Sequence, residues 1–281
     1  GMAMKNILKI MLMMITIFTI AGSAVYAAEI PVSDQDQLIT SNDWTEISNL
    51  QDEMKKEEPD ATIDYDKALK VYVDCNLIKL QTADTKKLTS ALESANYVWV
   101  IPFKMEKTYG MFTVAKGLPL REEAKSVLTK AEQEEVKNHA GKWMITEIAE
   151  HTVKPYYDIL LEKREALSDC TRVVLVGSQP GMRQPVALGM DDETARIWIS
   201  LGYQYPVMKK IPETQNVESG VYSFDSVAEI SDTYIEDSEV STGAGVQSRS
   251  SMKYVAGIGI IVIGSILILS VLKKKKLEDY E

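Results

Sequence analysis

The sequence is poor in the residue types that most often carry catalysis or bind transition metals. Among 281 residues there are two histidines, His139 and His151, and two cysteines, Cys75 and Cys170. The histidines lack the i, i+4 spacing of a helical metal site, so we expect surface or capping roles for both. No cofactor is indicated by any motif in the chain.

Motifs for nucleophilic catalysis and for calcium binding are also missing. The chain contains no Gly-x-Ser-x-Gly sequence, which would place a serine on a sharp strand-to-helix turn. Both cysteines border apolar, strand-like runs and are expected to face inward, whereas a reactive thiolate needs an exposed, electropositive surrounding. Asp34 and Asp36 begin like a calcium loop, but Leu38 and Ile39 stand where an oxygen ligand and a glycine are needed.

Paired carboxylates are the one catalytic arrangement that these absences leave open. Glycosidase-type acid pairs are defined by their separation in space and not by a sequence motif. Glu147 with Glu150, on one expected strand, and Asp191 with Asp192, in one expected turn, are the available pairs. We expect them to be solvated surface residues, which is the usual place of acidic side chains. A cell-envelope hydrolase using two carboxylates is therefore the alternative function.

The first 27 residues have the organisation of a secretory signal peptide. Two lysines precede an apolar run over residues 10–21, and small residues then lead to a cleavage site between Ala27 and Ala28. An uncleaved membrane anchor is the alternative, but the apolar run is short for a membrane span. We therefore predict that residues 1–27 are a signal peptide and that the chain is exported.

A second apolar segment runs from Tyr254 to Leu272 and contains no charged residue. At about 1.5 Å per residue, a helix over residues 254–272 is about 28 Å long, which is enough to cross the hydrocarbon core of a bilayer. It is followed directly by four lysines, Lys273, Lys274, Lys275 and Lys276. Because lysines beside a span stay in the cytoplasm, we predict a single-pass cell-membrane protein with its N-terminal domain outside and residues 273–281 as a cytoplasmic tail.

The part of the chain between these two segments is acidic. Residues 28–253 have a formal net charge of about −13, since six of the 31 basic residues and three of the 41 acidic ones lie outside this range. Such a charge disfavours nucleic acid and anionic lipid surfaces as partners. No Asn-x-Ser/Thr acceptor occurs in these residues, which fits a bacterial surface protein. The expected partners are the lipid bilayer, through the C-terminal helix, and a protein or cell-envelope component.

Periodicity predicts alternating helices and strands over residues 44–227. Apolar residues at helical spacing, together with cap and stop signals, predict helices at 44–56, after Asp84, at 121–139 and after Pro155. Runs rich in β-branched and aromatic residues predict strands at 68–75, 97–105, 109–116, 143–150, 171–176, 186–190, 195–201 and 221–227. In the first strand, alternation places Lys70 and Tyr72 on the face opposite to Leu69 and Val71.

These elements predict an α+β domain over residues 28–228, with a mixed or antiparallel sheet and helices packed on it. The order strand, helix, strand, strand, helix, strand over residues 68–150 is that of a split βαβ, ferredoxin-like core. The domain is either single or divided into lobes 60–150 and 151–228. Residues 229–253 are rich in serine, threonine, glycine and acids, and are predicted to form a flexible stalk.

Aromatic residues and cysteines supply the remaining predictions. Tyr203 and Tyr205, next to Pro206, are candidate residues of a binding surface. Cys75 and Cys170 can form a disulfide in an exported protein or remain buried free thiols, and both alternatives stay open. With no assembled catalytic set, the sequence favours a non-enzymatic binding or accessory module that is held on the cell surface by a membrane anchor.

Overall fold

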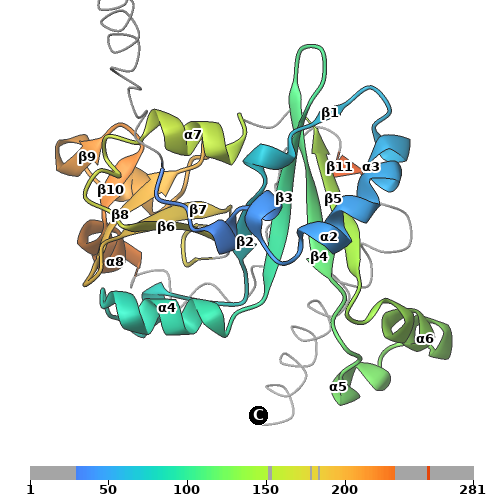
Figure 1. Cartoon of the computed structure of the whole chain (residues 1–281). Helices are drawn as coiled ribbons and strands as arrows, with labels where there is room; N and C mark the ends of the chain where they lie inside the picture. The colour runs from blue at the N-terminus through green and yellow to red at the C-terminus, as the bar shows by residue number, and fades with distance from the viewer. Residues whose placement is uncertain (1–29, 151–153, 178, 183, 232–251, 254–281) are drawn as a thin grey trace, which may run out of the picture. The chain divides into compact units, whose positions relative to one another are not determined.

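The computed structural model describes residues 30–150, 154–177, 179–182, 184–231 and 252–253 (Figure 1). The described residues from Pro31 onward form one compact unit. The predicted signal peptide, transmembrane segment and cytoplasmic tail lie outside the described residues, as does most of the predicted stalk. Within the described residues, no helix combines the length and the apolar character needed to cross a membrane.

The unit is a mixed α+β fold built on one 11-stranded sheet. Ten strands follow the order β11-β5-β4-β3-β2-β6-β7-β8-β10-β9, and β1 pairs with β3 beside this path. The strands are β1 (Thr62–Ile63), β2 (Leu69–Tyr72), β3 (Tyr97–Lys104), β4 (Tyr109–Lys116), β5 (Trp143–Glu150), β6 (Arg172–Val176), β7 (Val186–Met190), β8 (Ala195–Ser200), β9 (Asn216–Glu218), β10 (Val221–Ser223) and β11 (Met252–Lys253).

Two antiparallel meanders make up this sheet. One contains β2 to β5 and the other contains β6 to β8 with β10 and β9, and they meet where β2 pairs with β6 in parallel. The residue ranges suggested as two lobes thus contribute to a single sheet. The predicted split βαβ core is not present, because β2 and β3 are adjacent antiparallel strands, whereas a split βαβ unit needs them parallel and separated. The predicted order of elements was correct, but order alone does not determine pairing.

Short helices lie around the sheet. The α-helices are α2 (Trp44–Ile47), α3 (Gln51–Glu57), α4 (Thr85–Glu93), α5 (Glu122–Lys125), α6 (Lys130–His139), α7 (Tyr156–Glu162) and α8 (Phe224–Ser231). The 3-10 helices are η1 (Asp34–Asp36), η2 (Leu38–Thr40), η3 (Ser48–Leu50), η4 (Tyr65–Lys67), η5 (Ile78–Leu80), η6 (Met208–Lys210) and η7 (Glu213–Gln215). In Figure 1, α7 and α4 flank strands β6–β8 from above and below, and α2 and α3 lie in front of the other meander.

Local sequence signals explain where several helices begin. The Asp84 carboxylate accepts a hydrogen bond from the Lys87 amide (3.0 Å) and caps α4, as predicted. The predicted helix at 121–139 is divided into α5 and α6, because Thr129 and Glu132 form a capping box that starts a new helix. The predicted last strand ends at Ser223, and α8 continues the chain to Ser231, inside the predicted stalk.

Apolar side chains form two core clusters. The first lies between strands β3–β5 and the N-terminal helices and includes Leu38, Ile47, Trp99 and Phe112. The second lies around strands β6–β8 with α4 and α8. Strand β2 is in the interior of the sheet, where it pairs with β3 and β6, and all four of its residues are buried, including Lys70. The predicted alternation along β2 is therefore between two buried faces and not between core and solvent.

Candidate functional site

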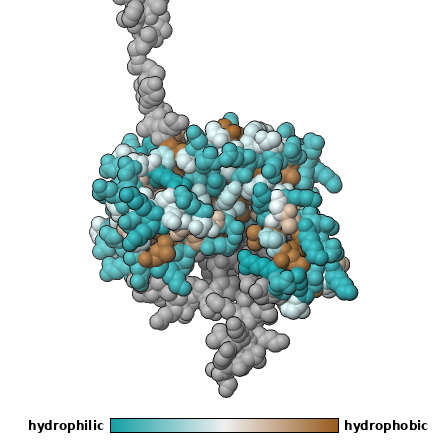
Figure 2. Space-filling model, turned by 60° about the horizontal axis from the view of Figure 1, so that its bottom comes forward, coloured by the Kyte–Doolittle hydropathy of each residue, from teal (hydrophilic) through white to brown (hydrophobic). Residues whose placement is uncertain are grey.

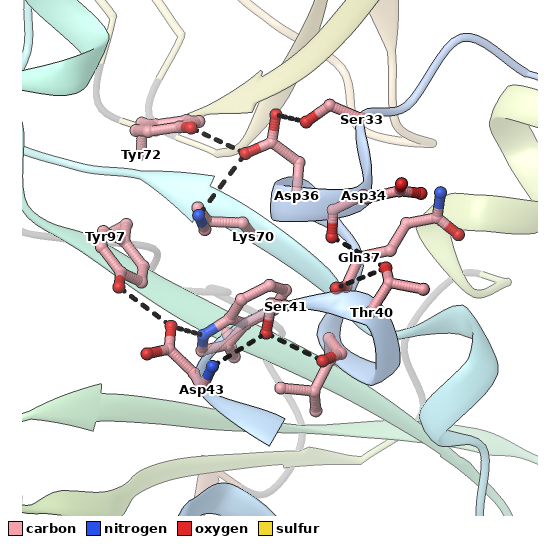
Figure 3. Close-up of polar contacts among 12 residues, drawn as sticks. Ser33, Asp34, Asp36, Gln37, Thr40, Ser41, Asp43, Lys70, Tyr72 and Tyr97 are labelled. Atoms are coloured by element: carbon pink, nitrogen blue, oxygen red, sulfur yellow. Dashed lines mark hydrogen bonds and ion pairs between the residues drawn. The ribbon is translucent and has the colours of Figure 1, made fainter. Parts of the chain in front are cut away.

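The residues before the first strand form a strap, here defined as residues 31–50, that runs over the sheet near β2. Its start is fixed by a hydrogen bond from the Val173 amide to the Pro31 carbonyl (2.7 Å). Further along, the Leu38 amide donates to the Ala68 carbonyl (3.1 Å). Within the strap, the Thr40 hydroxyl donates to the Asp34 carbonyl (2.7 Å), which tightens the turn (Figure 3). The strap thereby carries acidic side chains over the face of β2.

Asp36 joins the strap to both meanders through a buried polar network. Its carboxylate accepts hydrogen bonds from the hydroxyls of Tyr72 (2.6 Å) and Ser33 (2.8 Å) and from the Arg172 guanidinium (3.0 Å). The Lys70 ammonium lies 3.6 Å from the same carboxylate. Figure 3 shows Ser33 of the strap and Lys70 and Tyr72 of β2 converging on Asp36. Because Asp36 is only 2% exposed, these partners replace the water that a buried carboxylate would lose.

Lys70 is surrounded by aromatic rings. Its ammonium lies 4.4 Å from the ring centroid of Tyr97, 5.3 Å from that of Trp99 and 5.7 Å from that of Tyr72. These distances are in the range of favourable cation–π contacts. Burial lowers the pKa of Lys70, and the nearby Asp36 carboxylate opposes that shift. The strap thus supplies the counter-ion that this buried lysine requires.

Asp43 makes a second contact between the strap and the sheet. Its carboxylate accepts hydrogen bonds from the Tyr97 hydroxyl (2.9 Å) and from the Trp99 indole nitrogen (3.0 Å). Burial raises the pKa of Tyr97, and the Asp43 carboxylate raises it further. Asp36 and Asp43 therefore fix the strap at two points, and we call the two carboxylates with Lys70, Tyr72, Tyr97 and Trp99 the clamp.

Beside the clamp, the strap forms one wall of a shallow groove of about 490 Å³. The strap contributes Ile39 and Trp44, and the opposite side is formed by residues 62–66 and Lys104. The Trp44 and Tyr65 rings contact each other edge to face, with centroids 5.2 Å apart and planes at 69°. The Tyr65 hydroxyl lies 3.8 Å from the Met54 sulfur, so its polar end points into the core. The aromatic ring of Tyr65 lines the groove.

Charged residues of both signs border the groove. Asp64 lies 3.4 Å from Lys67, which also pairs with Asp158 of α7 at 3.1 Å. In the part of the chain that the structure describes, neither Asp66 nor Lys104 has an ion-pair partner. The groove thus combines apolar and aromatic surface with one carboxylate and one ammonium that are not engaged. This combination is typical of a recognition surface, in which a few polar groups orient a ligand on an apolar wall.

A second cavity, of about 360 Å³, lies between residues 166–170, β8 and the start of α8. Cys170 lines it together with Asp169, Arg196 and Asp225. Burial raises the pKa of the Cys170 thiol to about 11. The thiol therefore stays protonated at neutral pH and is a poor nucleophile, as predicted from the sequence.

The structure buries one of the two predicted binding tyrosines, Tyr205. Tyr205 is 2% exposed, and its hydroxyl donates to the Pro185 carbonyl. Tyr203 is half-buried, and its hydroxyl lies 3.0 Å from that of Tyr156. Tyr205 packs in the second core cluster, where it fills apolar space, so it is not available to a partner.

The two cysteines are free thiols. Tyr72 of β2 lies beside Val176 of β6, and these strands are parallel. Cys75 follows Tyr72 by three residues, whereas Cys170 precedes Val176 by six, so they lie at opposite ends of the strand pair. Strand β6 from Arg172 to Val176 alone separates the two ends by about 13 Å, at about 3.3 Å per residue. A disulfide needs Cα atoms within about 7 Å, so this fold does not permit the bridge.

Asp191 and Asp192 are not arranged as a catalytic acid pair. Asp191 accepts hydrogen bonds from the Thr194 and Glu193 amides (2.7 and 2.8 Å), which lower its pKa, whereas a general acid needs a raised one. Asp192 accepts a hydrogen bond from the Thr171 hydroxyl (2.8 Å). Glu147 is buried on β5, and the Glu150 side chain is outside the description. Among the described residues, no cluster of His, Cys, Asp or Glu is suited to a metal ion.

No protein-family model, curated protein or solved structure shows a significant match to this chain. The functional argument therefore depends on the geometry of its own residues. Sequence reasoning missed the clamp and the groove, because it placed residues 28–43 in the domain but assigned them no helix, strand or site. One signal was available, since Lys70 stands between the apolar residues Leu69 and Val71 in a predicted strand.

Proposed function

We propose that the protein is a non-enzymatic binding module, displayed on the outer side of a cell membrane and tethered by residues 254–272. The observation that carries the binding role is the groove beside the clamp. It presents Ile39, Trp44 and Tyr65 together with unengaged charges on the surface of a single compact unit. The location outside the membrane follows from the apolar segment 254–272 and its four lysines.

The clamp supports this proposal because it holds the groove wall in place without taking part in chemistry. Lys70 lines neither of the two cavities, and its ammonium is surrounded by rings and by Asp36. A wall that is fixed before the ligand arrives loses little conformational freedom on binding. The buried charges of the clamp hold the strap in one position, and this favours a rigid recognition surface.

In vivo photo-crosslinking tests whether the groove binds a partner. A photoreactive phenylalanine derivative is placed at Ile39, which is 38% exposed in the groove, and in a control chain at Val127, which is 48% exposed elsewhere. On intact cells we expect a discrete crosslinked product from position 39 and none from position 127. Added purified wild-type chain should suppress the product, because it competes for the same partner.

The matched competitor carries Thr62→Tyr. Thr62 is exposed on β1 and lines the groove, so a tyrosine there fills the groove without disturbing the core. This competitor should leave the crosslinked product unchanged. Equal crosslinking from both positions, or equal suppression by both competitors, would rule out the groove as the binding site.

The predicted topology has its own test. Lys86 and Lys87 are exposed on α4, whereas the tail lysines follow the predicted span. A membrane-impermeant amine reagent should label the α4 lysines on intact cells and should label the tail lysines only after permeabilisation. Labelling of the tail alone on intact cells would invert the topology and remove the extracellular role.

A further inference from the structure

We propose that the groove recognises a lysine side chain of a partner protein. The Trp44 and Tyr65 rings contact the ammonium on one side, and the Asp66 carboxylate contacts it on the other. This inference rests on the proposed function and adds the chemistry of the ligand. The groove contains the two elements that stabilise a desolvated ammonium, namely aromatic surface and an unengaged carboxylate. The acidic character of residues 28–253 adds long-range attraction for a basic segment.

The protein already contains a completed version of this arrangement. Inside the clamp, the Lys70 ammonium lies within 4.4 to 5.7 Å of three aromatic rings and 3.6 Å from the Asp36 carboxylate. In the groove, Trp44 and Tyr65 stand at 69° to each other and Asp66 lines the same groove, and among the described residues no lysine or arginine lies over either ring. The comparison is chemical: each site combines rings in different planes with one carboxylate.

Ring geometry favours lysine over arginine. A planar guanidinium stacks best on one flat aromatic face, whereas a compact ammonium interacts with rings of different orientation at the same time. The edge-to-face contact of Trp44 and Tyr65 offers two ring planes at 69° and not one continuous flat surface. The groove volume of about 490 Å³ exceeds the needs of one ammonium and leaves room for neighbouring partner residues.

Lys104 adds a constraint on the residues next to that lysine. It lines the same groove and, within the described part of the chain, has no ion-pair partner. A run of lysines placed along the whole groove would be repelled at this position. The preferred segment therefore carries one lysine at the Trp44 side and an acidic residue or a free carbonyl at the Lys104 side.

Binding of defined peptides to the purified full-length chain tests the proposal. The probes are a soluble Gly-Ser peptide with one lysine followed by one glutamate, the same peptide with acetyl-lysine, and the same peptide with arginine. Affinity is measured by the change in tryptophan fluorescence or by NMR titration. We expect the lysine peptide to bind about fivefold or more tightly than the acetylated peptide, because acetylation removes the cation.

Two charge-matched variants separate the groove from general attraction to an acidic protein. Asp66→Asn and Asp52→Asn each remove one exposed carboxylate, but only Asp66 lines the groove. Asp66→Asn should lower the affinity for the lysine peptide about fivefold, and Asp52→Asn should leave this affinity unchanged. Trp44→Ala should abolish binding, and Trp44→Phe, which keeps an aromatic ring in the groove wall, should restore part of it.

The outcomes decide between the ligand chemistry and the binding role. Equal binding of lysine and acetyl-lysine peptides, or equal weakening by the two asparagine variants, overturns the lysine proposal. If a crosslinked partner is nevertheless captured from position 39 and lost to wild-type competitor, the binding function stands and its ligand has another chemistry. If position 39 captures nothing while the lysine peptide binds as expected, the groove has the proposed chemistry and the cell-surface role fails.

Discussion

Removing the Asp36 carboxylate is the sharpest test of the clamp. In Asp36→Ala, Lys70 loses its counter-ion in a site where its side chain is 9% exposed, and the buried Tyr72 hydroxyl loses its acceptor. Arg172 is 26% exposed and can regain water, so its lost contact contributes little. Breaking a buried ion pair by removing one partner costs about 3 to 5 kcal/mol. We therefore expect Asp36→Ala to lower the free energy of unfolding by about 4 kcal/mol.

A double-mutant cycle with Lys70→Met separates the ion pair from general packing. In Lys70→Met the Asp36 carboxylate keeps its hydrogen bonds from Tyr72, Ser33 and Arg172, so this change should cost about 1 to 2 kcal/mol. In the double variant no uncompensated lysine remains. Its cost should therefore be at least about 2 kcal/mol smaller than the sum of the two single costs.

Urea unfolding of the purified full-length chain, followed by tryptophan fluorescence, measures these differences, because Trp99 and Trp198 are fully buried. A cost below about 1 kcal/mol for Asp36→Ala would show that the buried ion pair does not hold the strap. Additive single and double variants would show that Asp36 and Lys70 do not act together. Either result would refute the rigid groove wall on which the binding proposal depends.

Three further predictions concern packing, pH and thiol chemistry. Gly110→Ala should lower the free energy of unfolding by about 1 to 3 kcal/mol in urea, because the new Cβ would lie 2.1 Å from the buried Phe103 ring, and Phe103→Leu should relieve part of this cost. Asp191 has a lowered pKa, so its contribution to stability is complete above pH 3.8 and is lost as pH falls through the pKa of the folded state. The free energy of unfolding of Asp191→Asn should therefore depend less steeply on pH below about 4 than that of the wild type. Equal pH slopes for the two chains would contradict this. Native Cys75 and Cys170 should react slowly with iodoacetamide at pH 8, since burial raises the pKa of each to about 11. In urea both thiols should become reactive, and fewer than two reactive thiols would indicate a disulfide.

Local structure was predictable because its signals lie within a few residues. The hairpin of β3 and β4 follows from two β-rich runs and a short polar link, and both strands appear at the predicted places. The start of α4 follows from Asp84, whose carboxylate caps the helix. Such features depend on neighbouring residues alone and need no knowledge of the tertiary fold.

Pairing between distant strands was not predictable in the same way. Strand β2 pairs in parallel with β6, although about 100 residues separate them. A periodic pattern states which residues share a face but not which strand lies beside it. The helix between β2 and β3 suggested a crossover to a parallel strand, whereas in the fold it connects antiparallel neighbours. The ferredoxin-like expectation failed for this reason.

The candidate site was hidden because burial of β2 depends on this distant pairing. Without β6 the strap would lose its contacts with Val173 and Arg172, and the face of β2 that carries Lys70 and Tyr72 would be left uncovered. Pairing with β6 brings Arg172 alongside and places the second meander next to β2, so Lys70 becomes buried and requires a carboxylate. The strap supplies Asp36, and its position then determines where Trp44 meets Tyr65. The groove is therefore a consequence of a charge that the sheet order has buried, and no sequence segment taken alone contains enough information to predict it.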